Sequence, residues 1–189
     1  MNEREIVLPD RKPYQEWLLG RAVEMTGGGY KHAATKGWLG VRLTHWAEGR
    51  GYAGMSWTFR LAPRGEVRRP LIPDLAYLSY ERARALSGEE LEMPPIAPDA
   101  AFEILAPEDV PAHLHHKLDV YLAAGASAVV FADPYAGSIS VHDASGGRTL
   151  RPGEAFAHAA LPGFTFTVEE MLAEARFPTR STAPTATEE

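Results

Sequence analysis

Three charged residues stand at positions where the surrounding pattern calls for apolar side chains. Asp74 interrupts the apolar run PLIPDLAYLS, and Glu103 interrupts the run AAFEILA. Lys117 lies in the segment that follows, where it borders the apolar face of a predicted helix. A buried charge without a partner is costly, so such residues persist when they are paired, bound to a metal or directed into a cleft.

Together these residue types could hydrolyse a phosphodiester bond. Two carboxylates on neighbouring strands would repel each other unless a cation or a shared proton lay between them. A divalent cation held there would lower the pKa of its bound water, and an ammonium group would stabilise the charge that develops on phosphate. Any one of the three could simply be a hydrogen-bonded structural residue, and Lys117 could pair with Glu103 or extend to solvent. Their combined placement favours a site.

The elements that would position these residues follow from hydrophobic periodicity. Alternating or continuous apolar runs predict strands over residues 20–26, 55–61, 70–79, 100–106, 126–133 and 138–144. Within the run at 100–106, alternation places Glu103 on one face with Ala101 and Leu105, and Phe102 with Ile104 on the other. The last two strands are joined by PYAG, which predicts a hairpin.

Helices are predicted where apolar residues recur at helical spacing, over residues 31–48, 110–124 and 168–175. Asp109 is the predicted N-cap of the second helix, with Pro111 in its first turn and Gly125 just past its end. Thr167 and Glu170 have capping-box spacing at the head of the third. The mixed order of strands and helices predicts an α/β or α+β fold around one central sheet.

Length and composition suit one globular domain, expected over residues 1–177, with a disordered tail at 178–189. The chain has no cysteine, which excludes disulfides and thiolate zinc sites and fits a reducing cytoplasm. The charged N-terminus predicts neither a signal peptide nor a membrane span.

The net charge of −6 argues against a protein whose whole surface binds nucleic acid. An arginine-rich stretch at 42–84 nevertheless allows one basic face.

Several short segments, in this order and spacing, resemble one known family. The segments IPDLAYLS, FEILAPED, KLDVYLAAG and VVFADP look like those of the Uma-type putative restriction endonuclease family, in the PD-(D/E)XK nuclease superfamily. GRAVEM and LPGFTFTVEEML are similar to the family's opening and closing segments, so the resemblance covers roughly residues 14–174. It implies a restriction-endonuclease-like core, a central mixed β-sheet flanked by helices. It also implies an endonuclease that uses Mg²⁺ or Mn²⁺, acts on nucleic acid (DNA is expected) and forms a homodimer.

Carried over residue by residue, the resemblance makes Asp74 and Glu103 the metal carboxylates and the backbone carbonyl of Ile104 a further ligand. The superfamily usually places a lysine two residues after the glutamate, where this chain has a leucine. The Uma-type family instead has a lysine on the next helix and a tyrosine four residues later, which Lys117 and Tyr121 match.

Five further positions bear on this assignment. The family often has serine where this chain has Ala106, so one hydroxyl near the expected site is missing. Glu16 and His32 align with positions that are often polar in the family, and we expect them to contact the metal ligands rather than the metal itself. His113 and His116 share a helix face, but no third ligand is evident for zinc, so they are expected at the rim of the site at most.

Two other classes of function remain open on the sequence. The acidic net charge and Ala106 are compatible with an inactive PD-(D/E)XK-fold protein that serves as a binding or assembly module. An unrelated structural scaffold would require Asp74 and Glu103 to lie far apart. The loop TGGGYKH lacks the signatures of phosphate-binding loops and predicts only a turn.

Overall fold

A six-stranded mixed sheet forms the centre of the computed structural model, which describes residues 5–9, 11–25, 27–63 and 65–176. The tail predicted at 178–189 lies outside these residues. In sheet order the strands are β10 (Gly146–Leu150), β9 (Ser138–Asp143), β8 (Ala128–Asp133), β7 (Ala100–Ile104), β6 (Leu75–Ser79) and β3 (Gly51–Met55). Only the β7–β8 pair is parallel among these neighbours, and the connection between the two strands contains a helix, as parallel pairing requires.

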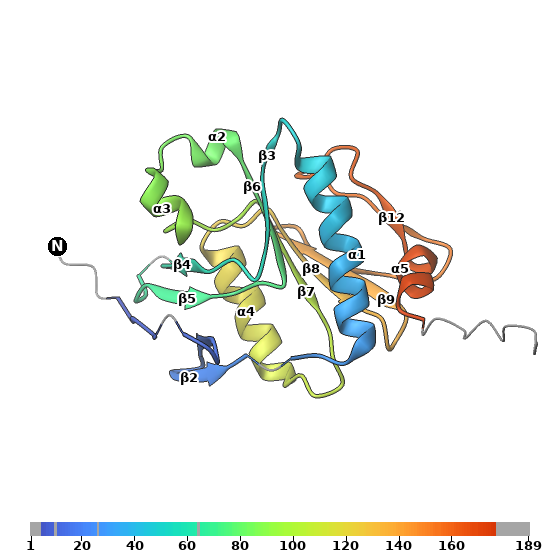
Figure 1. Cartoon of the computed structure of the whole chain (residues 1–189), viewed down its shortest axis with the longest axis horizontal. Coiled ribbons are helices and arrows are strands. Elements are labelled where there is room, and N and C mark those ends of the chain that lie inside the picture. Colours follow the sequence, from blue (N-terminus) through green and yellow to red (C-terminus); the bar gives the residue numbers. More distant parts are fainter. Residues whose placement is uncertain (1–4, 10, 26, 64, 177–189) are drawn as a thin grey trace, which may run out of the picture.

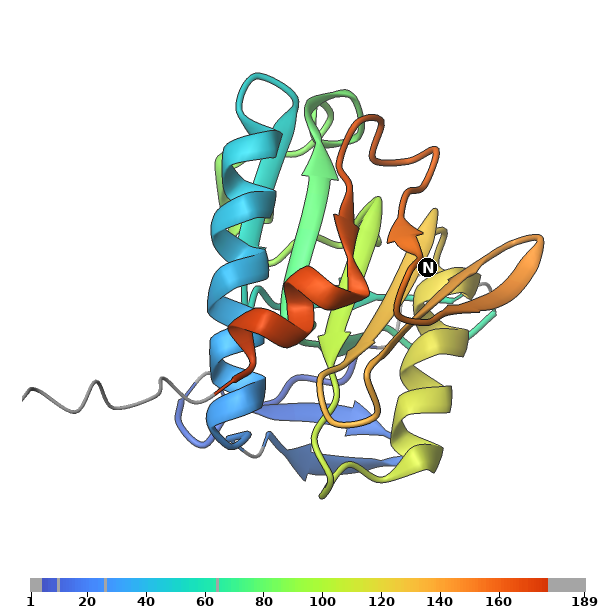
Figure 2. The ribbon, with the colours of Figure 1, turned by 90° about the vertical axis from the view of Figure 1, so that its right-hand side faces the viewer.

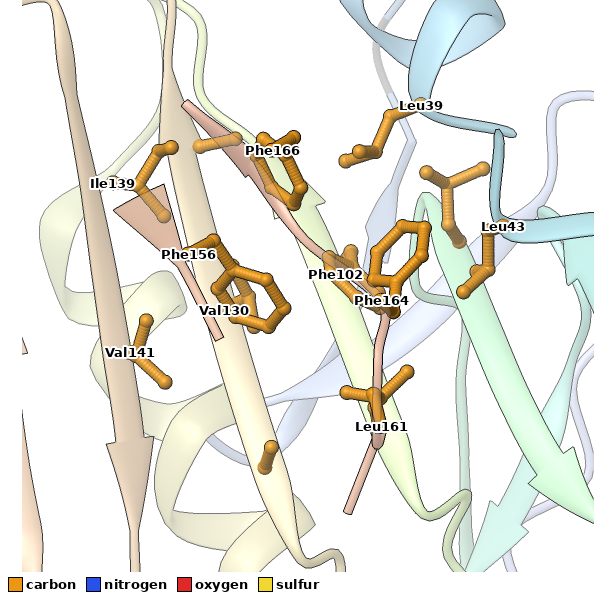
Figure 3. Close-up of a cluster of buried hydrophobic side chains, with 14 of the residues drawn as sticks. Leu39, Leu43, Phe102, Val130, Ile139, Val141, Phe156, Leu161, Phe164 and Phe166 are labelled. Atoms are coloured by element: carbon orange, nitrogen blue, oxygen red, sulfur yellow. The ribbon is translucent and has the colours of Figure 1, made fainter. Parts of the chain in front are cut away.

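Helices cover both faces of this sheet. Helices α1 (Tyr30–Ala47) and α5 (Val168–Glu174) lie on one face, and α4 (Pro111–Ala123) lies on the other (Figures 1 and 2). Figure 3 shows Leu39 and Leu43 of α1 directed toward Phe102 and Phe164 in the core on the α1 side. A second core contains Tyr121 and other apolar residues of α4 with the opposite face of β7 and β8. The mixed sheet flanked by helices predicted from the sequence is confirmed.

Smaller elements surround the sheet. They are the hairpin of β1 (Gln15–Leu18) and β2 (Arg21–Glu24), the pair of β4 (Phe59–Leu61) and β5 (Arg69–Leu71), the pair of β11 (Ala155–Phe156) and β12 (Phe166–Thr167), and the short helices α2 (Tyr80–Ala83) and α3 (Gly88–Glu92). The β1–β2 hairpin lies beside the first turns of α4 (Figures 1 and 2). This arrangement brings the N-terminal part of the chain to the end of the sheet where the charged residues cluster.

Two strands predicted from apolar runs are each divided in the structure. The run at 55–61 ends β3 at Met55 and starts β4 at Phe59, because Ser56 adopts a left-handed backbone with φ +50° that breaks the extended ladder. The run at 70–79 is divided between β5 and β6 by Pro73, which has no N–H to continue a strand. Asp74 therefore lies in a bend immediately before β6, where its side chain can face a cleft.

Helix termini agree with the sequence at two positions and differ at one. Thr167 and Glu170 form the predicted capping box of α5, and Gly125 follows α4 with a left-handed φ of +96°. The predicted N-cap role of Asp109 is wrong: Val110 is the N-cap residue of α4 and caps it with no side-chain bond. The Asp109 carboxylate instead accepts the Ala106 N–H at 2.8 Å, a closer donor that closes the loop after β7.

Within the described ranges, no helix combines the length and the apolar character needed to cross a bilayer.

Candidate active site

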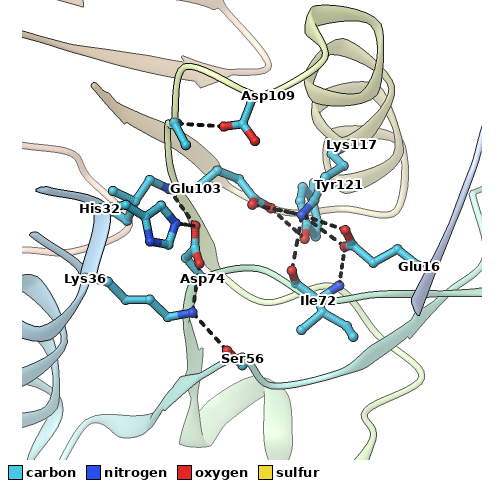
Figure 4. A network of polar contacts seen from close by, with 12 residues as sticks. Glu16, His32, Lys36, Ser56, Ile72, Asp74, Glu103, Asp109, Lys117 and Tyr121 are labelled. Atoms are coloured by element: carbon cyan, nitrogen blue, oxygen red, sulfur yellow. Dashed lines mark hydrogen bonds and ion pairs between the residues drawn. The ribbon is translucent and has the colours of Figure 1, made fainter. Parts of the chain in front are cut away.

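Asp74, in the bend before β6, is held by contacts from two elements, β7 and α1. Its Oδ2 accepts the Ile104 N–H at 2.8 Å and lies 3.3 Å from His32 Nε2 (Figure 4). Its Oδ1 accepts a hydrogen bond from Lys36 Nζ at 2.8 Å, and that amine also donates to Ser56 Oγ at 2.9 Å. The backbone bond to Ile104 ties Asp74 to β7, the strand that carries the second predicted acid.

Glu103 lies in a buried polar network on the α4 side of β7. Lys117 Nζ donates to Glu103 Oε2 at 2.8 Å and lies 3.0 Å from Glu16 Oε1 (Figure 4). The Tyr121 hydroxyl donates to Glu103 Oε1 at 3.1 Å. Ile72 closes the network, since its carbonyl accepts from Lys117 at 3.1 Å and its N–H donates to Glu16 at 2.6 Å.

The local structure of α4 explains how Lys117 and Tyr121 both reach one carboxylate. Residues four apart on a helix lie one above the other on the same face. That face packs on the side of β7 that carries Ala101 and Glu103, so both polar groups meet the only carboxylate of that strand. Glu103 and Lys117 are each only 5% exposed. Because a buried charge without a partner is costly, each of the two depends on the other.

Electrostatics differ sharply between the two acids. Burial raises the pKa of Glu103 to about 8, and Glu16 and Asp74 add to the rise while Lys117 opposes it. Burial also raises the pKa of Asp74, but the contacts from His32 and Lys36 outweigh it and hold that pKa below its usual range. Burial lowers the pKa of Lys117, but Glu103 and Glu16 reverse this and place it above its usual range, so the amine stays charged.

Two clefts meet at Asp74 and His32. The narrow cleft has a volume of about 200 Å³ and is rich in carboxylates: Glu16, Glu24, Asp74, Glu103, Glu108 and Asp109. The wide groove has a volume of about 1250 Å³, and its wall includes Lys12, Lys36, Tyr14, Ser56 and Trp57. The site is therefore acidic on one side of Asp74 and carries lysines on the other.

These residues fit a hydrated Mg²⁺ ion better than a fully protein-bound metal. Among the described residues, no three His, Cys, Asp or Glu side chains are grouped so that they could hold an ion. Mg²⁺ commonly uses one or two carboxylates and keeps several waters, so Asp74, Glu103 and the Ile104 carbonyl would be sufficient protein ligands. Burial, with smaller contributions from Glu16 and Asp74, raises the pKa of Glu103, and a divalent cation beside this carboxylate would favour its ionised form.

The structure brings the residues singled out from the sequence into one place. Six of them line the narrow cleft: Glu16, His32, Asp74, Glu103, Ile104 and Lys117. Tyr121 lies behind this wall and contacts it through Glu103. Because Asp74 and Glu103 share the cleft, the scaffold interpretation, which required them to lie far apart, is wrong.

The two histidines considered for the rim have separate surroundings. His113 lines the narrow cleft, whereas His116 lies 3.5 Å from Arg69. The sequence interpretation missed Lys36, although His32 and Lys36 are one turn apart on a predicted helix and could have been paired on that basis. It also missed Ser56, for which the sequence carries no comparable signal because its backbone conformation depends on packing.

Comparison with known proteins identifies the family. The model of the Uma2 family, described as "Putative restriction endonuclease", matches residues 5–169. A crystal structure of a putative nuclease belonging to DUF820 from Anabaena variabilis superposes with a TM-score of 0.78 at 16% identity, covering 89% of this chain and 95% of that one. At this identity the likeness concerns the fold. No curated protein matches the sequence. The match over most of the chain agrees with the resemblance seen in the sequence motifs, and the protein belongs to the Uma2 family of putative restriction endonucleases.

Proposed function

We propose that this protein is a divalent-metal-dependent endonuclease that hydrolyses phosphodiester bonds in nucleic acid, with DNA as its substrate. The observation that carries the proposal is the meeting of Asp74, just before β6, and Glu103, on β7, in one cleft beside a buried lysine. Membership of a family described as putative restriction endonucleases supports the same reaction class.

In this proposal Asp74, Glu103 and the Ile104 carbonyl hold Mg²⁺ or Mn²⁺. When bound, the cation would supply an activated water and stabilise the charge that develops on the phosphate. Glu103 must be ionised to take part, and Lys117 lowers its pKa against the effect of burial. Lys117 donates to Glu103, Glu16 and Ile72, which uses its three N–H groups. It therefore acts by orienting and ionising Glu103 rather than by contacting the phosphate.

Nucleic acid would approach through the wide groove. The carboxylates of the narrow cleft repel phosphate, whereas Lys12 and Lys36 on the groove side attract it. Asp74 lines both spaces, so a phosphate in the groove would lie beside the proposed cation.

The direct test is an assay of purified protein with Mg²⁺ or Mn²⁺ on supercoiled plasmid, single-stranded DNA and RNA. The wild type should cut DNA, and Asp74→Asn should reduce the rate by about a hundredfold or more, the usual cost of losing one charge-stabilising group. Asp119→Asn is a matched control, because Asp119 is exposed on α4 outside both clefts. Equal rates for the wild type and Asp74→Asn, or no cutting of any substrate with either metal, would refute the proposal.

An inactive binding or assembly module is the second candidate, and one observation favours it. The polar network is closed by protein groups, since Lys117 is saturated by its partners and Asp74 pairs with Lys36 and His32. Calorimetry with Mn²⁺ separates the two candidates, because a module of this kind has no reason to bind the ion. Homodimer formation and a cytoplasmic location stay predictions from the sequence, and analytical ultracentrifugation tests the first.

A further inference from the structure

We infer that Lys36 exchanges between two partners: Asp74 when the site holds no cation, and a phosphate of the substrate in the wide groove when a divalent cation is bound at Asp74. This rests on the proposed function, since it requires that Asp74 binds a metal. It adds a residue on α1 to the machinery and assigns it the task of linking metal binding to substrate binding.

The contacts of Asp74 identify the oxygen that a cation would take. Oδ2 has two partners, the Ile104 N–H at 2.8 Å and His32 Nε2 at 3.3 Å, and the first is fixed in the backbone of β7. Among the described residues, Oδ1 is bonded by the flexible side chain of Lys36 at 2.8 Å. A cation can therefore bind Oδ1 without disturbing the sheet, but it meets the Lys36 ammonium there. Two positive groups on one oxygen repel each other, so the lysine must leave.

Lys36 is placed to leave toward the groove. Its side chain is 20% exposed, compared with 6% for Lys117, and it lines the wide groove together with Ser56. Ser56 Oγ accepts a second hydrogen bond from the amine at 2.9 Å, and the Ser56 N–H bonds the Asp74 carbonyl at 3.0 Å. The exposed serine thus keeps the amine near the site on the groove side, where nucleic acid would lie.

A phosphate is the partner that the groove offers to the released amine. An ammonium group that has lost a carboxylate needs another anion or water, and a charge-assisted bond to a phosphate oxygen is the stronger choice. The phosphate that contacts a cation on Asp74 would be next to Lys36. Metal binding would therefore increase the affinity of the groove for the strand through Lys36 as well as through the ion itself.

The experiment measures two affinities of the full chain in the wild type, Lys36→Met and Lys12→Met. The first is Mn²⁺ affinity by calorimetry without nucleic acid. The second is the affinity for a fluorescent oligonucleotide with EDTA and with Ca²⁺ in place of Mg²⁺. Lys12 is the control, because it lines the same groove but is not an ion-pair partner of Asp74, which pairs with His32 and Lys36. The Lys12 variant therefore measures the effect of losing one positive charge from the groove.

Lys36→Met should bind Mn²⁺ about tenfold more tightly, the size of effect that one neighbouring charge has on a carboxylate's affinity for a proton. It should also lose most of the increase in oligonucleotide affinity that Ca²⁺ produces in the wild type. Lys12→Met should keep the Mn²⁺ affinity and the Ca²⁺ effect while binding the oligonucleotide more weakly in both conditions. Lys36→Gln, which keeps a donor but no charge, should repeat both changes and replaces the methionine variant if that one does not fold.

Unchanged or weaker Mn²⁺ binding by the uncharged Lys36 variants would overturn the inference, as would a Ca²⁺ effect equal to that of the wild type. In those cases the proposed function stands, because the wild type still binds the metal. If neither the wild type nor the variants bind Mn²⁺, the proposed function and the inference fail together. Binding by the Lys36 variants alone would support the exchange, since it identifies Lys36 as the group that blocks Asp74.

Discussion

The carboxylate of Asp74 accepts the backbone N–H of Ile104, the residue that directly follows Glu103, at 2.8 Å. The bond therefore ties Asp74 to the strand position next to Glu103, the other acid of the candidate site. A backbone donor in a buried strand cannot turn away, so the distance between the two carboxylates is set by the pairing of β6 with β7. Lys36 and Lys117 then approach from opposite faces of the sheet, each on one acid.

Replacing Lys117 by methionine should destabilise the protein strongly. The change leaves Glu16 and Glu103 buried without their shared cation, and breaking a buried ion pair in this way costs about 3–5 kcal/mol. Urea unfolding followed by circular dichroism measures the free energy of unfolding. Lys31→Met is a suitable control, because Lys31 lies over the Tyr135 ring at the partly exposed start of α1.

The double variant Glu103→Gln/Lys117→Met gives the complementary measurement. It should recover part of the lost stability, since it removes one of the two unpaired charges. A double variant as unstable as the sum of the single changes would mean that Glu103 and Lys117 do not depend on each other.

Stability should fall as the pH rises from about 4.5 to about 8 because of Glu103. Its pKa in the folded protein is about 8, against an ordinary value of 4.5, so the folded state retains a proton that the unfolded state has released. This contribution is fully present below the ordinary pKa and is lost as the pH passes the folded value. Unfolding in urea at several pH values between 5 and 8 measures the slope, and Glu103→Gln should reduce it. A slope that is the same in the variant and the wild type would contradict the assignment to Glu103.

Magnesium should stabilise the protein more at pH 8 than at pH 6 if the proposed site is correct. The ion and the proton compete for Glu103, which is largely protonated at pH 6 and about half ionised at its folded pKa of about 8. The rise in Tm on adding Mg²⁺ measures the effect at each pH. Asp74→Asn should remove the rise at both pH values, and an equal rise in the wild type at pH 6 and pH 8 would argue against competition at Glu103.

At pH 9, where Glu103 is largely ionised, Tyr121→Phe should cost about 1.5–3 kcal/mol of stability, the range for a hydrogen bond to a charged group. The hydroxyl donates to Glu103 and the ring is fully buried, so phenylalanine keeps the packing and removes only the bond. The free energy of unfolding is the readout, and Tyr135→Phe is a control on a half-exposed tyrosine that lies outside both clefts. A change below about 0.5 kcal/mol, small even for an ordinary hydrogen bond, would show that Tyr121 contributes packing alone.

The sequence by itself determined the kind of site and much of the fold. A charge inside an apolar strand must be paired or functional, and this rule singles out Glu103 from its place in the run AAFEILA alone. Helical spacing places Lys117 and Tyr121 on one face, because it depends only on the geometry of a single helix. The order of the short motifs indicates the family that the comparison confirmed.

Only the tertiary structure decided which groups meet. Glu16 contacts Lys117 across 101 positions of the chain, and Lys36 contacts Asp74 across 38. Such pairs depend on how the hairpin and α1 pack on the sheet, which local patterns do not encode. Asp109 is a different case, since its predicted cap is replaced by a local bond to Ala106, three residues earlier, in the loop after β7. Periodicity describes each element alone, whereas the site forms where several elements end together.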